Sequence, residues 1–245
     1  MVTAIMVDGG FYKKRARQLF GEKPPEERAD ELYSYCCRHL REKTKTREEE
    51  HTLYRIFYYD CPPSEKSVMH PITKHTVDLR KSAIYTWTTD FFLALTAHRK
   101  VALRMGELLE SSGDYVLRSE ALKRLLRKEI EVDALSEKDF TLDFKQKGVD
   151  MRIGLDIASL AHKRLVSQIV LIAGDSDFVP AAKHARREGI DFILDPMWQP
   201  IKPTLHLHID GLRTVTKKPA DGAQRSEDRL CAAGGSDIQS QRSAP

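Results

Sequence analysis

The sequence has little of what defines several common protein classes. Its 245 residues include only four cysteines, and none of them forms a CxxC pair, which disfavours both a disulfide scaffold and a zinc ribbon. No stretch approaches the ~20 apolar residues of a membrane span. The opening MVTAIMVDGG has no basic region before its short apolar run, so we expect no signal peptide. These absences predict a soluble, cytoplasmic protein without a membrane partner.

Glycine-rich nucleotide-binding motifs and a large excess of one charge are missing too. Neither GxxxxGK[ST] nor GxGxxG occurs, so binding of a nucleoside triphosphate or a dinucleotide has no support. The 40 Lys and Arg residues against 36 Asp and Glu give a net charge of only +4. A protein that coats nucleic acid nonspecifically carries a larger basic excess. A polyanionic partner therefore has to bind at local basic patches.

What the sequence does contain is a regular alternation of short apolar runs and helical patterns. Residues 2–7, 53–60, 168–173 and 190–194 are predicted strands, and residues 11–20, 26–42, 151–165 and 178–188 are predicted helices. This order predicts an α/β fold with a mostly parallel central sheet and helices on both faces. Residues 1–215 form the predicted domain, with a helical insertion at about 64–138, and residues 216–245 form a predicted disordered tail.

Aspartates lie at the ends of the predicted strands and near the start of one helix. Singly they have simpler roles as N-caps or turn formers, but ligands of an open parallel sheet bind beyond the carboxyl ends of its strands. Clustered carboxylates need a cation or protons to neutralise them, and oxygen ligands without Cys or His favour Mg²⁺ or Mn²⁺. The predicted metal ligands are Asp8, Asp150, Asp156, Asp175 and Asp177.

Several of these acids lie in motifs that resemble one family. The segments are VDGGFY at 7–12, FYYDCPP at 57–63, QKGVD at 146–150, GLD at 154–156 and GDSDF at 174–178. Together they resemble the NYN domain family, bacterial proteins of the PIN-like nuclease superfamily, over about residues 2–62 and 139–212. Two features depart from the family: Phe11 stands where many members have Asn, and the insertion matches no family motif.

The resemblance implies a Rossmann-like PIN fold and divalent-metal-dependent ribonuclease activity, with an endonuclease as the expected type. The family's acidic positions carry over to Asp8, Asp156, Asp175 and Asp177 as catalytic residues, with Asp150 close by. Mg²⁺ or Mn²⁺ held by these acids would activate a water and stabilise the leaving oxygen of a phosphodiester.

RNA is the expected partner, and basic residues that would contact it fall into two groups. One group follows Asp8 on the first predicted helix, and the other lies on a basic helix predicted at 119–131. The predicted nucleic-acid contacts are Lys13, Lys14, Arg17, Lys123, Arg124, Arg127, Lys147 and Ser176.

Two other functions fit the same sequence. A HAD-type phosphatase has a similar last acidic motif, but it needs DxD after the first strand, and here Asp8 is followed by Gly9 and Gly10. A catalytically silent RNA-binding or regulatory module would keep the fold without cleaving RNA. The insertion is also a candidate surface for a homo-oligomer. His206 and His208 have no third metal ligand nearby, which favours a structural role.

Overall fold

The structure is a computed structural model that describes residues 1–43, 48–109 and 113–218. The predicted tail therefore lies almost wholly outside the described residues. Within them the chain forms two compact units. The first comprises Met1–Pro63, Ala83–Glu107 and Gln146–Lys218, and the second comprises residues 64–82 and the described part of 108–145.

A six-stranded sheet forms the centre of the first unit. Its strands are β1 (Val2–Asp8), β4 (Thr52–Asp60), β7 (Val101–Met105), β12 (Gln168–Ile172), β13 (Asp191–Asp195) and β14 (Gly211–Leu212). They follow the order β14-β13-β12-β1-β4-β7, and every neighbouring pair is parallel. The chain first builds outward from β1 to β7 and then returns to β12 on the other side of β1. The switch point of the topology, where such sheets bind ligands, is thus between β1 and β12.

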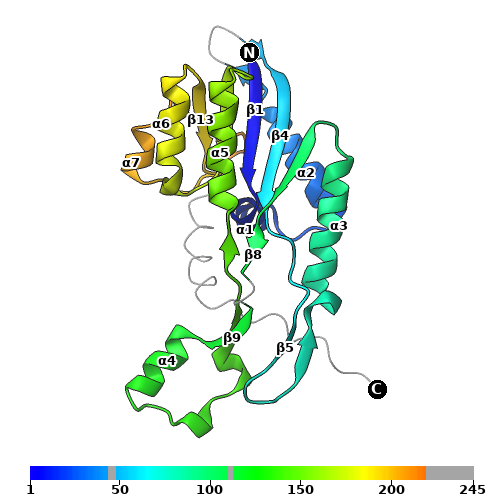
Figure 1. The fold of residues 1–245 in the computed structure, drawn as a ribbon, viewed down its shortest axis with the longest axis vertical. Coiled ribbons are helices and arrows are strands. Elements are labelled where there is room, and N and C mark those ends of the chain that lie inside the picture. Colours follow the sequence, from blue (N-terminus) through cyan, green and yellow to red (C-terminus); the bar gives the residue numbers. More distant parts are fainter. Residues whose placement is uncertain (44–47, 110–112, 219–245) are drawn as a thin grey trace. The chain divides into compact units, whose positions relative to one another are not determined.

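Helices cover both faces of this sheet. One face packs against α1 (Gly9–Phe20), α2 (Pro25–Arg38) and α3 (Ala83–Ala97), and the other against α5 (Val149–His162) and α6 (Val179–Arg187). Figure 1 shows α5 and α6 on the near side of the sheet and α2 behind it. Because both faces are covered, the strands are continuous apolar runs, and all five residues of β12 are buried. The predicted α/β class with a parallel sheet is confirmed.

The segment predicted as a helical insertion, residues 64–138, is divided between the two units. Helix α3 and strand β7 belong to the first unit, where β7 extends the central sheet beside β4. Val101, Leu103 and Met105 alternate with the period of two that an edge strand requires, a signal that a helical interpretation missed. The part outside the central domain is therefore smaller and less helical than expected.

The second unit is built mainly from short strands. A hairpin joins β5 (Ser67–Met69) to β6 (Thr76–Asp78), and β9 (Asp114–Leu117) pairs antiparallel with β10 (Phe140–Asp143). The basic helix predicted at 119–131 is the shorter α4 (Ser119–Leu126).

The remaining elements of the described residues, from both units, are short. They are β2 (Arg41–Lys43), β3 (Glu48–Glu50), β8 (Glu107–Leu108), β11 (Gln146–Lys147), α7 (Pro203–His206) and four 3₁₀ turns.

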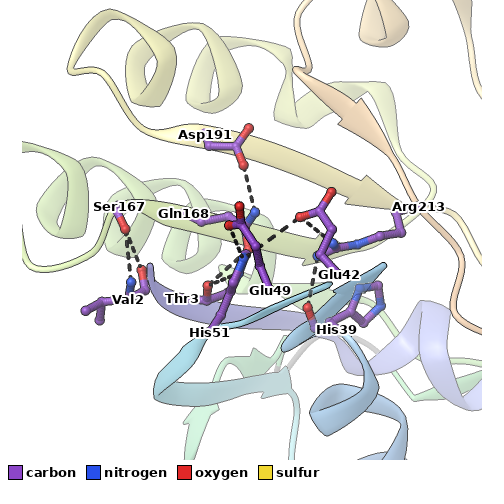
Figure 2. A network of polar contacts seen from close by, with 10 residues as sticks. All are labelled: Val2, Thr3, His39, Glu42, Glu49, His51, Ser167, Gln168, Asp191 and Arg213. Atoms are coloured by element: carbon purple, nitrogen blue, oxygen red, sulfur yellow. Dashed lines mark hydrogen bonds and ion pairs between the residues drawn. The ribbon is translucent and has the colours of Figure 1, made fainter. Parts of the chain in front are cut away.

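A buried polar network joins the amino ends of β1, β12 and β13 (Figure 2). The side chain of Gln168 donates from Nε2 to Asp191 Oδ2 at 2.7 Å and accepts the Thr3 hydroxyl at Oε1, at 3.0 Å. Because a carboxylate only accepts, Asp191 fixes the orientation of the Gln168 amide. His51 Nδ1 lies 3.0 Å from the same Oε1, so this ring nitrogen carries the proton.

Replacing Gln168 with leucine should destabilise the fold strongly, because the buried Thr3 hydroxyl would lose its acceptor and His51 Nδ1 would keep only the longer contact to the Thr3 oxygen, at 3.2 Å. Each unsatisfied buried group costs roughly 1–3 kcal/mol, so we expect the free energy of unfolding to fall by about 3 kcal/mol in urea titrations. Ser167→Ala is the control for an exposed polar contact, because the Ser167 hydroxyl bonds the Val2 backbone at the solvent-exposed end of the same network. A loss no larger than that of the control would contradict this role of the network.

Candidate active site at the carboxyl edge of the sheet

The turn from β1 into α1 sets Asp8 at the carboxyl edge. Asp8 is the N-cap of α1, and its Oδ1 accepts the backbone N–H of Phe11 at 3.1 Å. The next residue has to be glycine, because a Cβ on Gly9 would lie 2.6 Å from the Tyr58 hydroxyl and from the Tyr59 carbonyl oxygen. This close approach brings Asp8 beside the end of β4.

Four of the five predicted metal ligands influence one another in the structure. The pKa of Asp8 is raised to about 6, chiefly because burial disfavours the charged form. The hydrogen bond from Phe11 opposes this shift, and the negative charges of Asp150 and Asp60 add to it. Burial likewise raises the pKa of Asp150, with smaller contributions from Asp175 and Asp177. We call Asp8, Asp150, Asp175 and Asp177 the acidic cluster.

Asp175 and Asp177 of the acidic cluster lie on the loop that follows β12. Both side chains are exposed, and the Asp177 N–H donates to Asp175 Oδ1 at 3.2 Å. The backbone of Ser176 opens the 3₁₀ turn Ser176–Phe178, but its side chain, a predicted RNA contact, lies outside what the structure describes. Across the switch point, the Phe11 ring packs so closely on Gly174 that a Cβ there would lie 2.6 Å from a ring carbon. The family's Asn position is thus filled by an apolar ring.

Asp156 lies apart from the acidic cluster. Its Oδ2 accepts a hydrogen bond from the Tyr59 hydroxyl at 2.8 Å and pairs with Arg104 Nε at 3.1 Å. Six residues separate it from Asp150 on α5, a rise of ~9 Å and a rotation of ~240°, so the two carboxylates leave different sides of the helix. Tyr59 and Arg104 thus occupy the Asp156 carboxylate, and a shared site of Asp156 with Asp8 stays a prediction.

Asp60 is a site residue that the sequence analysis missed. It ends β4, the neighbour of β1, and its side chain is fully buried. Lys13, predicted to contact RNA, forms an ion pair with it, with 2.6 Å between Lys13 Nζ and Asp60 Oδ2. The signal that could have found Asp60 is its place at the carboxyl end of a predicted strand, the same signal that identified Asp8.

The other predicted RNA contacts are divided between the two units. Lys14 and Lys147 are exposed in the first unit, and Arg17 pairs with exposed Glu22. The three predicted contacts on α4 belong to the second unit. There Lys123 and Arg127 lie near Glu120 and Glu129, and Arg124 is exposed.

The acidic cluster has the donor chemistry of a site for a hard divalent cation. Its ligand atoms are carboxylate oxygens, and desolvation, with a smaller contribution from neighbouring carboxylates, raises the pKa of Asp8 and Asp150, a cost of ionisation that a cation would offset. Throughout residues 1–43, 48–109 and 113–218, however, no three His, Cys, Asp or Glu side chains lie close enough to form a complete metal site. To hold an ion together, the carboxylates of the cluster would therefore have to lie closer to one another than they do here.

Comparison with known proteins gives one family match. The NYN domain model matches residues 108–197, a range that includes Asp150, Asp156, Asp175 and Asp177 and begins inside the segment that had no recognised motif. None of the curated proteins matches the chain, and none of the described helices is both long and apolar enough to cross a membrane.

The chain is similar to a solved structure of a protein of unknown function from Vibrio parahaemolyticus. The two sequences are 14% identical, and the matched region covers 86% of this chain and 90% of the Vibrio chain. The TM-score between the two structures is 0.41. The family match is the finding that bears on function: residues 108–197 match the model of the NYN domain, the family that the acidic motifs resemble.

Proposed function

We propose that the protein is a divalent-metal-dependent ribonuclease that cleaves RNA internally at the acidic cluster. The NYN domain supports a nuclease kind of activity. The observation that carries the proposal is the gathering of Asp8, Asp150, Asp175 and Asp177 near the switch point of a parallel sheet, where burial and mutual repulsion raise the pKa of Asp8 to about 6.

In this proposal each part of the cluster has a distinct task. Asp8 and Asp150 would hold Mg²⁺ or Mn²⁺ from the sheet and from α5, and Asp175 and Asp177 from the loop after β12. Such an ion supplies Lewis acidity and activates water for attack on a phosphodiester. Asp8 must give up its proton for the ion to bind, and the Phe11 N–H then stabilises the carboxylate. The proposed location is the cytoplasm, as the sequence predicts.

The silent RNA-binding module remains the second candidate, because two observations favour it. Asp156, an acid that the resemblance marks as catalytic, is occupied by Arg104 and Tyr59. Phe11 places an apolar ring where many family members have an amide. Self-association through the second unit stays a prediction.

Incubating the full chain with end-labelled RNA, single-stranded and structured, should distinguish these functions. With Mg²⁺ or Mn²⁺ we expect internal cleavage products, and with EDTA none; a DNA oligomer of the same sequence tests the preference for RNA. Asp175→Asn should reduce cleavage at least about a hundredfold, since it removes a ligand that acts in the transition state. Asp133→Asn, at an exposed acid of the second unit, is the control.

Cleavage that persists in EDTA, or that survives Asp175→Asn unchanged, would contradict metal-dependent catalysis at this cluster. RNA binding without any cleavage would favour the silent module instead.

A further inference from the structure

We propose that Lys13 binds a phosphate of the RNA backbone beside the acidic cluster, and that buried Asp60 is the positioning residue that holds Lys13 there. This inference rests on the proposed function, because it assigns residues for holding the substrate of that reaction. It assigns a role to Asp60, which lies in the FYYDCPP segment but was not among the predicted site residues, and gives Lys13 a defined place.

The geometry of α1 directs Lys13 toward the end of β4. Lys13 comes four residues after Gly9, about one helical turn, so both lie on the same side of α1. Gly9 is the residue packed against Tyr58 and Tyr59 of β4. The lysine side chain therefore runs along the carboxyl edge of the sheet to Asp60, which ends that strand.

Asp60 is itself held rigidly. Its Oδ2 accepts the Tyr58 hydroxyl at 3.0 Å, and its Oδ1 accepts the Cys61 N–H at 2.9 Å. A fully buried carboxylate is tolerated only when it is paired and hydrogen-bonded, and Lys13 completes this set at 2.6 Å. The position of the ammonium is thus determined by the core of the sheet and not by the solvent-exposed part of α1.

Lys13 retains capacity for a ligand. An ammonium has three N–H donors, and Asp60 is the one hydrogen-bonding or ion-pair partner of Lys13 in the described part of the chain. The lysine side chain is 28% exposed, whereas that of Asp60 is 0% exposed. Solvent therefore reaches the Lys13 side chain but not that of Asp60, and the Lys13 ammonium has N–H donors left for a ligand.

The ion pair also lies where an RNA phosphate needs a positive charge. Asp60 is close enough to Asp8 for its charge to act on it, so Lys13 stands beside the acidic cluster. A phosphate that approaches this cluster is repelled by its carboxylates. A fixed ammonium offsets that repulsion, and as a point charge it suits a phosphate without reading a base.

The double variant Lys13→Met, Asp60→Asn tests the inference, because it removes both charges and leaves no buried charge unpaired. Thermal unfolding checks that it is folded. We expect a fluorescent single-stranded RNA 12-mer in EDTA to bind about tenfold more weakly, and the slope of log K against log salt to fall by about 0.7, the value for one phosphate contact on a single strand. Lys163→Met, at the far end of α5, is the control.

Two single variants separate positioning from structure. Lys13→Arg should restore affinity to within about threefold, since the positive charge remains. Asp60→Asn keeps Lys13 but removes the carboxylate that holds its ammonium in place. We therefore expect kcat for RNA cleavage to fall about tenfold or more, while the Kd for RNA changes about threefold. A purely structural pair would instead lower the melting temperature of these variants without changing the salt slope.

Wild-type affinity and salt slope in the double variant would overturn the inference. The binding arm is measured without metal, so its result does not depend on cleavage. If the wild type cleaves no RNA but the double variant still loses affinity and slope, the nuclease proposal fails and the assignment of Lys13 stands.

Discussion

Asp8→Asn is expected to abolish metal-dependent RNA cleavage and at the same time to stabilise the metal-free protein. Cleavage should fall at least about a hundredfold, because the variant loses a ligand from the sheet side of the acidic cluster. Stability should rise because the folded protein keeps the Asp8 carboxylate ionised at a cost. Asparagine remains a good N-cap, so the hydrogen bond from Phe11 is retained.

The size and pH dependence of this stabilisation follow from the pKa of Asp8, which folding raises from 3.8 to about 6. Between these values the folded protein binds a proton that the unfolded chain has lost, so wild-type stability falls as the pH rises from about 4 to 6. Above pH 6 the cost has reached its full value, about 3 kcal/mol. Asp8→Asn should therefore exceed the wild type by up to that amount at pH 7.5.

Urea unfolding of both proteins in EDTA at pH 4 and pH 7.5 measures the difference. It should be largest at pH 7.5 and should nearly vanish at pH 4, where most of the Asp8 carboxyl is protonated in the folded wild type. Asp133→Asn controls for the loss of one negative charge elsewhere. If Asp8→Asn is less stable than the wild type at pH 7.5, then ionising the Asp8 carboxyl does not destabilise the folded protein, which would contradict its raised pKa.

The second large effect is stabilisation of the wild type by Mn²⁺. A ligand at a hundred times its Kd adds about 2.7 kcal/mol to the folded state, which raises the melting temperature of a domain of this size by roughly 5–10 °C. The rise should be large at pH 7.5 and small at pH 5, because Asp8 is mostly protonated below its pKa of about 6 and protons then compete with the ion.

Thermal unfolding with and without Mn²⁺ tests this prediction without any activity assay. The double variant Asp8→Asn, Asp175→Asn should lose most of the rise, whereas Asp133→Asn should keep it. An equal rise in the double variant would place the metal elsewhere. No rise in the wild type at millimolar Mn²⁺ would show that the acidic cluster does not bind the ion.

The sheet and most of its acids were predictable because they depend on short-range patterns. A strand buried on both faces is an apolar run, as in residues 168–172, and an acid directly after such a run marks the carboxyl edge. Asp8 follows such a run directly, and Asp175 follows one after a single intervening glycine, so both were predicted in this way. The α/β class followed from the alternation of strands and helices, without knowledge of the strand order.

The rest depends on which segments meet, which local patterns do not contain. The ion pair of Lys13 with Asp60 spans 47 positions and exists because β4 lies beside β1. Asp156 was placed on the correct helix, but its side of that helix follows from how α5 packs on the sheet. Strand β7 was misinterpreted because five residues of an edge strand carry too few alternating positions to exclude a helix.

The strand order also governs the sequence of events in folding. Strand β1 pairs with β4 about fifty positions later, but its other neighbour, β12, comes 165 positions after it. Contacts of such long range are slow to form, because a large loop has to close first. During synthesis Asp8 is made long before Asp150, Asp175 and Asp177. These like charges therefore come together only when the distant segments that carry Asp150, Asp175 and Asp177 pack beside β1.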